Sequence, residues 1–235
     1  MNVEPSGNRL LARINWREYP ELEGRFKSMR LKQGEVLYEA RAPIRYAYFP
    51  TSAVLSSVVV MTDGNMIEVA TVGREGGVGI STIAAAGTSP NRVFVQVPGE
   101  TVRIEADLLQ KVVRREGPIQ DLFLKYHDAF LFQVSQSVAC NGLHSVPERC
   151  CRWLLLTHDR VDGNELLLTH EFMSVMLGVR RPSVTGILQG LKERCLIRYT
   201  RGKITVLDRE GLEEGSCECY QVVREDYLSR MNGEA

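Results

Sequence analysis

Hydrophobic and polar residues alternate over short distances between residues 30 and 105. Stretches rich in β-branched and aromatic residues are separated there by glycine, proline and aspartate, which is typical of strands joined by tight turns. Asp63-Gly64 lies between two apolar runs and predicts a hairpin, because both residues tolerate a positive φ. So many short strands at this spacing favour a small antiparallel barrel or jelly roll. The predicted strands are EVLYEA, YAYFP, AVLSSVVVM, MIEVATVG and NRVFVQVPGETVRI.

After Gly117-Pro118 the apolar period lengthens from two residues to about 3.5, which predicts one long helix extending toward Gly142. A single apolar stripe follows this helix. Its members are Ile119, Phe123, Tyr126, Phe130, Val134 and Val138. A long helix with one apolar stripe needs a partner, and we expect these residues to form a dimer interface. The alternative is that the stripe packs on the β domain of its own chain.

A second helical region begins at Ser145-Val146-Pro147-Glu148, which has the capping-box pattern. Further on, Thr169 is expected to cap a short helix and Gly178 to end it. The next helix begins near Pro182, and four of its apolar residues recur at helical spacing. These residues are Val184, Ile187, Leu188 and Leu191. Two helices joined by a glycine turn form the helix-turn-helix pattern.

The outer face of this second helix carries polar and cationic residues. If its apolar residues face inward, Arg180, Arg181, Ser183, Gly186 and Gln189 lie near the surface. The following segment, LIRYTRGKITVL, predicts a two-stranded wing that turns at Arg201-Gly202.

The composition restricts the class of protein, and the distribution of charge adds a prediction about DNA binding. The 235 residues are 44% hydrophobic and 25% charged, which suits a soluble protein of one or two domains. A net charge of zero argues against a general nucleic-acid coat. The charge is unevenly distributed, however: residues 178–203 contain seven basic side chains and one acidic one, and residues 208–226 contain seven acidic and two basic ones. The basic block is either a solvated face or a DNA-binding surface, and its helix-turn-helix context favours DNA.

The chain shows neither a signal-peptide core nor an apolar run near the ~18 residues that span a bilayer, so we expect a cytoplasmic protein without membrane contact. All six cysteines lie in the second half: Cys140, Cys150, Cys151, Cys195, Cys217 and Cys219. Free thiols are expected in this setting. Cys217-Glu-Cys219 together with Cys150-Cys151 leaves a metal or redox role as the alternative.

The chain resembles the Crp/Fnr family of bacterial transcription regulators over nearly its whole length. The similar segments are LKQGEVLY, YAYFPTSAVLS, DGNMIEVATVGREGGVG and LTHEFMSVMLGVRRPSVTGILQGLKERCLI. The resemblance implies an α+β fold: an N-terminal antiparallel β-roll (a cupin-like double-stranded β-helix), a long dimerisation helix, and a C-terminal winged helix-turn-helix. The corresponding domains are a cyclic-nucleotide-binding-like sensor at 1–116, a dimerisation helix and hinge at 117–144, and a DNA-binding domain at 145–235.

The same resemblance implies a regulator rather than an enzyme. Its expected partners are double-stranded DNA, bound at a palindromic operator, and a second copy of the chain. RNA polymerase and a small-molecule effector are further candidates. A cupin-like enzyme is disfavoured because residues 1–126 contain no histidine to bind a metal.

The family's DNA-contacting residues carry over only in part. Arg181 matches the arginine that begins the recognition helix, but Pro182 and Gly186 replace the glutamate and second arginine that follow it in well-studied members. The operator sequence therefore does not transfer. We expect Arg181 to read a base, because arginine geometry favours guanine. The candidates for phosphate contact are Thr169, Arg180, Ser183, Gln189, Arg201 and Lys203.

The ligand-binding pattern of the family is incomplete. Cyclic-nucleotide binders use a glycine-glutamate pair and an arginine followed by small residues, whereas here Ile80 follows Gly79, and Val93-Phe94 follow Arg92. Gly79 and Arg92 stay as ligand-binding candidates, and a cyclic-nucleotide-responsive module is the disfavoured alternative. The usual iron–sulfur site of the oxygen-sensing branch is excluded, because no cysteine precedes Cys140. Haem is left open by His127 on the long helix, and no cofactor is assigned.

Overall fold

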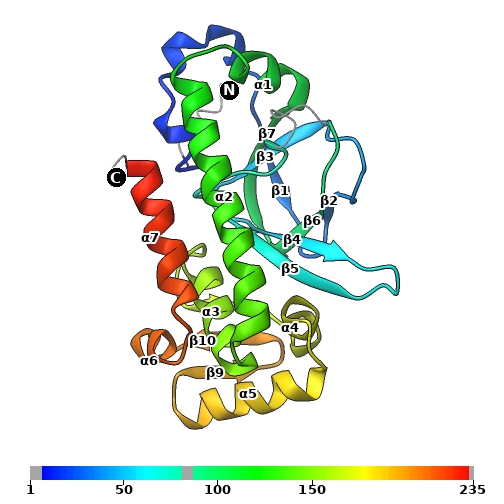
Figure 1. The fold of residues 1–235 in the computed structure, drawn as a ribbon, viewed down its shortest axis with the longest axis vertical. Helices are drawn as coiled ribbons and strands as arrows, with labels where there is room; N and C mark the ends of the chain where they lie inside the picture. The colour runs from blue at the N-terminus through cyan, green and yellow to red at the C-terminus, as the bar shows by residue number, and fades with distance from the viewer. Residues whose placement is uncertain (1–6, 81–86, 233–235) are drawn as a thin grey trace.

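A computed structural model describes residues 7–80 and 87–232 (Figure 1). Its N-terminal half contains two antiparallel sheets facing each other across an apolar core. One sheet has the order β1–β7–β3, with strands Lys27–Leu31, Gly99–Glu105 and Tyr46–Pro50. The other has the order β2–β6–β4–β5, with strands Val36–Tyr38, Arg92–Val97, Val54–Val60 and Met66–Val72. Tyr38, Leu55 and Val95 are among the side chains buried between them.

The strands agree with the alternating pattern of the sequence. All five predicted stretches contain strands, and β4 and β5 form a hairpin through Asp63-Gly64, where Gly64 has a φ of 85°. Several elements of this half were not predicted. Strand β1 begins at Lys27, before the region read as β, and a short helix α1 (Ala106–Val113) directly follows β7. Three 3₁₀ turns, η1 (Leu11–Arg13), η2 (Trp16–Glu18) and η3 (Pro20–Leu22), precede β1.

The long helix α2 (Pro118–Leu143) begins, as predicted, at the proline after Gly117. Ile119, Phe123 and Tyr126 are buried inside the protomer, where they pack against the barrel. The Phe123 ring meets the Phe49 ring of β3 edge-on, with centroids 6.2 Å apart. The prediction that these three residues form a dimer interface is therefore wrong, because their own barrel already covers them.

The other members of the predicted stripe are distributed over the sides of α2. Phe130 packs partly against the barrel core, Val134 is partly buried, and only Val138 is largely exposed. A different apolar row faces solvent. Leu124, Leu131 and Val138 repeat every seven residues and are 51%, 55% and 66% exposed. This row shares Val138 with the predicted stripe, and its other two members each lie one residue beyond a stripe residue, Phe123 and Phe130.

The C-terminal part begins with α3 (Val146–His158), directly after Ser145. The Glu148 carboxylate accepts a hydrogen bond from the Ser145 backbone N–H at 2.8 Å, as the capping-box pattern predicts. The remaining elements are β8 (Glu165–Leu166), α4 (His170–Leu177), α5 (Arg181–Glu193), β9 (Ile197–Thr200), β10 (Lys203–Val206), α6 (Arg209–Glu214) and α7 (Cys219–Asn232). Strands β8–β10–β9 form a small sheet. Helix α7 then runs back beside α2, as the red and green helices in Figure 1 show.

The β-sheet half and the helix-turn-helix part pack directly on each other. Val58 and Phe94 of the four-stranded sheet belong to the same apolar cluster as Trp153 and Leu154 of α3. In addition, the Phe94 and Phe172 rings lie edge to face, with centroids 5.9 Å apart. Within the described ranges, no helix combines the length and apolar character needed to cross a bilayer.

Candidate nucleic-acid interface

The helix-turn-helix is built from local signals that act as predicted. Thr169 caps α4 by accepting a hydrogen bond from the Phe172 backbone N–H at 3.1 Å. Gly178 ends α4 in the left-handed conformation, with a φ of 64°, which favours glycine over residues with a Cβ. Pro182 occupies the first turn of α5, where its missing N–H leaves no hydrogen bond unmade.

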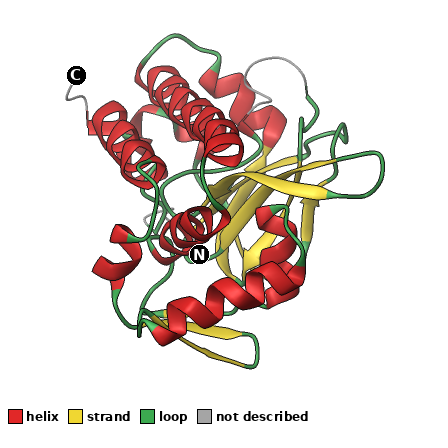
Figure 2. Ribbon diagram, turned by 60° about the horizontal axis from the view of Figure 1, so that its bottom comes forward, coloured by secondary structure: helices red, strands yellow, loops and turns green. Residues whose placement is uncertain are grey.

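Helix α5 separates its residues into an inner and an outer face. Val184, Leu188 and Leu191 are buried, and Ile187 packs against the same cluster. The predicted outer residues are all exposed: Arg180, Arg181, Ser183, Gly186 and Gln189. Figure 2, in which this end of the molecule comes forward, shows α5 crossing the end with the wing strands beside it.

A chain of contacts fixes the wing relative to α5. His170 of α4 lies with its Nδ1 2.9 Å from the Thr185 hydroxyl, and its ring lies 4.4 Å from the Tyr199 ring of β9. The Tyr199 hydroxyl accepts a hydrogen bond from the Gly202 backbone N–H at the wing turn. Burial and then the charge of Arg181 lower the pKa of His170, so this ring is neutral near pH 7. Sequence reasoning missed His170, whose role depends on residues 15 and 29 positions away.

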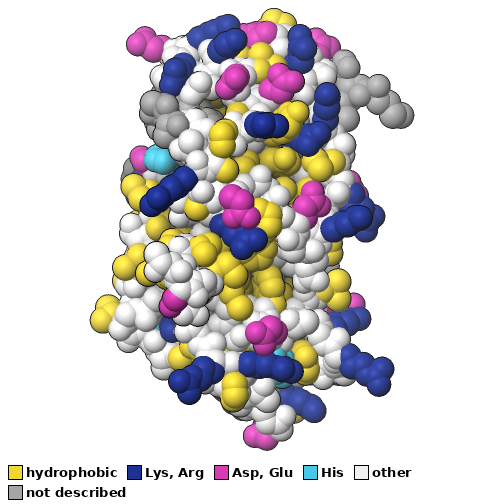
Figure 3. Space-filling model, turned by 90° about the vertical axis from the view of Figure 1, so that its right-hand side faces the viewer, with side chains coloured by type: hydrophobic (Ala, Val, Ile, Leu, Met, Phe, Trp, Pro, Cys, Tyr) yellow, Lys and Arg dark blue, Asp and Glu magenta, His cyan; other side chains and the backbone are white. Residues whose placement is uncertain are grey.

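The two cations of the wing differ in their surroundings. Arg201 and Gly202 form the turn with φ values of 42° and 81°, and the Arg201 side chain is exposed. Lys203 instead forms an ion pair with Glu165 of β8, with Nζ and the carboxylate 2.5 Å apart. Arg201 is therefore the freer of the two for a phosphate. Lys and Arg side chains are prominent at this end of the molecule in Figure 3.

Residues 148–214 match the family model of the Crp-like helix-turn-helix domain. The solved structures that share the fold include the regulator FixK2 from Bradyrhizobium japonicum, with 14% identity, a TM-score of 0.70, and coverage of 82% of this chain and 98% of that one. The chain therefore contains a Crp-like helix-turn-helix domain and shares the fold of Crp/Fnr regulators.

Two more solved structures extend the likeness. A putative Crp/Fnr regulator from Eubacterium rectale has 18% identity and a TM-score of 0.67 over 89% of this chain and 98% of that one. A CRP-family regulator from Thermus thermophilus has 16% identity and a TM-score of 0.67 over 80% and 96%. No curated protein matches the chain in sequence.

Each of the two ligand-binding candidates has a contact within the chain that accounts for it. Gly79 has a φ of 85°, and a Cβ there would lie 2.5 Å from the Tyr38 hydroxyl, so the position requires glycine for packing alone. Arg92 begins β6 and pairs with Glu39 at 3.4 Å. Residues 81–86, which begin the segment between these two candidates, lie outside the described ranges.

The β-sheet half of the chain also forms polar contacts with α3, the helix that leads into the helix-turn-helix. Glu68 of β5 is buried and accepts a hydrogen bond from Trp153 Nε1 of α3 at 2.8 Å. The Ser56 and Thr71 hydroxyls donate to the same carboxylate. Burial raises the pKa of Glu68 despite these donors. These contacts were not predictable from the sequence, where Glu68 reads as one polar position of an alternating strand.

Proposed function

We propose that this regulator binds a palindromic operator as a homodimer and that its sensor half controls the binding in response to a signal. The DNA-binding part of the proposal rests on one observation. Helix α5 presents Arg180, Arg181 and Gln189 on one exposed face, beside a wing that carries an exposed Arg201. A helix of this kind fits the major groove, and a basic wing can contact the adjoining phosphates.

Within this interface we assign base reading to Arg181 and phosphate contacts to the other candidates. Arg181 is exposed in the first turn of α5, the part of a recognition helix that faces base edges. Its planar guanidinium can donate two hydrogen bonds to guanine, which is worth about 1–3 kcal/mol of discrimination. Thr169, Arg180, Ser183, Gln189, Arg201 and Lys203 remain proposals for the backbone, with Lys203 weakened by its ion pair to Glu165.

The dimer part of the proposal rests on the exposed row of α2. Leu124, Leu131 and Val138 follow a heptad and lie on one side of the helix, which is the spacing of a two-stranded coiled coil. A two-fold axis along this row presents two α5 helices to two half-sites. In helix-turn-helix dimers such half-sites lie about 34–36 Å apart, one turn of DNA.

A gel-shift titration against salt on an operator selected from genomic fragments tests the interface. Arg181→Ala should weaken binding by roughly 5–150-fold for each half-site and lose base preference at one position of each half-site. Arg201→Ala should weaken all sequences alike and reduce the salt slope by about one unit per half-site. Lys111→Ala, which removes an exposed cation of α1, is the matched control and should change neither. Salt-independent binding, or unchanged base preference without Arg181, would contradict the proposed interface.

A further inference from the structure

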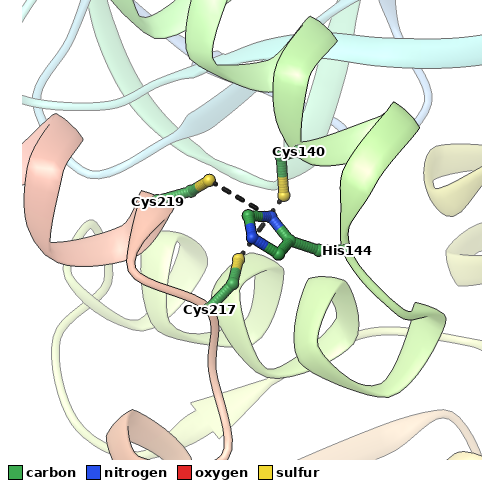
Figure 4. A group of neighbouring side chains, drawn as sticks. All are labelled: Cys140, His144, Cys217 and Cys219. Atoms are coloured by element: carbon green, nitrogen blue, oxygen red, sulfur yellow. Dashed lines mark hydrogen bonds between the residues drawn. The ribbon is translucent and has the colours of Figure 1, made fainter.

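Three cysteines and one histidine meet where the long helix ends (Figure 4). Cys140 lies in the last turn of α2, and His144 directly follows this helix as its C-cap, four residues further on. Cys219 begins α7, and Cys217 lies two residues before it. This Cys-x-Cys pair, for which a metal or redox role together with Cys150-Cys151 was the alternative, is grouped with Cys140 and His144 instead.

The spacing of the four side chains suits a single tetrahedral metal ion. One ligand atom from each residue lies within 4.8 Å of the other three. The Cys140 and Cys217 Sγ atoms are 3.5 Å apart, as are the Cys219 Sγ and His144 Nδ1 atoms. A tetrahedron with zinc–sulfur bonds of about 2.3 Å and a zinc–nitrogen bond of about 2.0–2.1 Å has edges of roughly 3.5–3.8 Å. An iron–sulfur cluster distributes its ligands over several irons and needs wider spacing.

The surrounding residues orient these ligands. His144 Nε2 lies 3.2 Å from the Glu218 carboxylate, which leaves Nδ1 directed at the sulfur atoms. A carboxylate on the outer nitrogen is the usual partner of a metal-bound histidine. Gln136 Nε2 donates a hydrogen bond to Cys219 Sγ at 3.1 Å. Both partners hold a ligand in the orientation that a central ion requires.

The charge around the group fits a bound thiolate site. One divalent ion with three thiolates and a neutral imidazole carries a net charge of about −1. Arg149 and Arg152 of α3 are buried nearby, and in the described part of the chain the Nε atom of each has no hydrogen-bond partner. Arg149 interacts electrostatically with Cys140 and Cys217, and Arg152 with Cys140. Two buried cations next to three cysteines compensate such a negative site.

We propose that Cys140, His144, Cys217 and Cys219 bind one structural zinc ion. The residues form a Cys₃His set, one of the closed ligand sets of structural zinc sites, and leave no position for a substrate. Zinc binding displaces the protons of the three thiols and changes no oxidation state. The ion joins residues 77 positions apart and holds α7 against the end of α2, next to the junction with α3.

Metal analysis of the full-length protein, purified without added chelator, tests the site. We expect one zinc ion per chain, released when a mercurial reagent titrates the thiols. Cys217→Ser and Cys219→Ser should each lower the zinc content to well below half an ion per chain. Cys195→Ser is the matched control, because Cys195 is exposed and lies outside the group, and it should retain a full ion. Glu218→Gln should keep the ion but weaken its affinity about 10–100-fold in competition with a chelator, since it changes only the partner of His144.

A spectroscopic measurement covers the case in which the cysteine variants fail to fold. Cobalt replaces zinc in the wild-type chain and should give the visible bands of a tetrahedral thiolate site. Three outcomes would overturn the proposal: folded protein that contains no stoichiometric metal and takes up no cobalt, iron together with acid-labile sulfide, or a Cys140–Cys217 disulfide in the purified protein. The measurements do not involve DNA, so they stand or fall independently of the proposed operator binding.

Discussion

Replacing Leu131 by alanine should weaken the proposed dimer without harming the protomer. Leu131 is 55% exposed at the centre of the row that also contains Leu124 and Val138. The exposed part of the Leu131 side chain makes no contact within its own chain, so shortening that part removes no contact inside the protomer. In a two-fold dimer it would pack against the same row of the second copy.

The size of the effect follows from this exposure. Complete burial of a leucine side chain stabilises by about 1.5–3 kcal/mol, so covering the exposed half contributes roughly 0.8–1.6 kcal/mol. The interface is symmetric and each substitution therefore acts twice, which gives about 1.6–3.2 kcal/mol per dimer. Since alanine retains part of the contact, we expect a loss of about 1–3 kcal/mol, or a dimer dissociation constant roughly 5–150-fold higher.

Sedimentation equilibrium over a concentration series measures this constant directly. At protein concentrations between the dimer dissociation constants of wild type and Leu131→Ala, the variant should also bind the operator more weakly. A dimer contacts two half-sites at once and the two contacts reinforce each other, whereas a monomer makes only one. Leu207→Ala is the control, since Leu207 is 49% exposed and lies at the end of the wing, away from α2. A wild-type monomer, or an unchanged dissociation constant in Leu131→Ala, would refute the assignment of this row as the interface.

Three further predictions concern the sensor half. The Tyr126 hydroxyl donates to the Gly77 carbonyl and accepts from the Gly77 N–H. Tyr126→Phe should therefore lower the free energy of unfolding in urea by about 1–3 kcal/mol and leave the dimer dissociation constant unchanged. An unchanged unfolding free energy with a weakened dimer would restore Tyr126 to the interface. Burial raises the folded-state pKa of Glu68 above 4.5, so its contribution to stability is present below that value and is lost as the pH rises through the folded pKa. From pH 4.5 upward, the unfolding free energy of wild type should therefore fall relative to that of Glu68→Gln. A difference between the two that does not change with pH would contradict this. Because Arg92 pairs with Glu39, millimolar cyclic AMP should barely change the unfolding temperature, whereas a shift of several degrees would support the cyclic-nucleotide alternative.

The helix-turn-helix could be predicted from the sequence because its signals are local. Thr169, Gly178 and Pro182 each determine the backbone within one turn of themselves, and the apolar spacing of α5 determines its inner face. The wing turn follows from Arg201-Gly202 in the same way. None of these positions depends on a distant part of the chain for its conformation.

The surface of α2 could not be assigned in this way, because two apolar rows lie one residue apart. Phe123 and Phe130 belong to the row expected at the interface, and Leu124 and Leu131 belong to the exposed row. Both rows have the same period, and the choice between them depends on aromatic contacts with β3, such as the Phe123–Phe49 pair. The apolar periodicity of the sequence shows that α2 has two apolar rows, but it does not show which surface covers each row.

The metal-binding group was hidden for a similar reason. Cys140 and His144 have helical i, i+4 spacing, which is a recognisable pair of metal ligands, but Cys217 and Cys219 join them only because α7 folds back along α2. The spacing of Cys140 and His144 indicated two of the four ligands. The other two could not be assigned to them without knowing that α7 folds back along α2.

Only two residues, His144 and Ser145, separate α2 from α3, and both already have extended backbones, with ψ values of 151° and 154°. Two residues span at most about 7 Å, so this link has no length in reserve. In the proposed dimer this short link, together with the apolar contacts between α3 and the four-stranded sheet, holds each DNA-binding part at a fixed distance from the two-fold axis. Half-sites moved apart by one base pair, about 3.4 Å along the DNA, would require these contacts to break. The protein should therefore discriminate the separation of its half-sites as strictly as their base sequence.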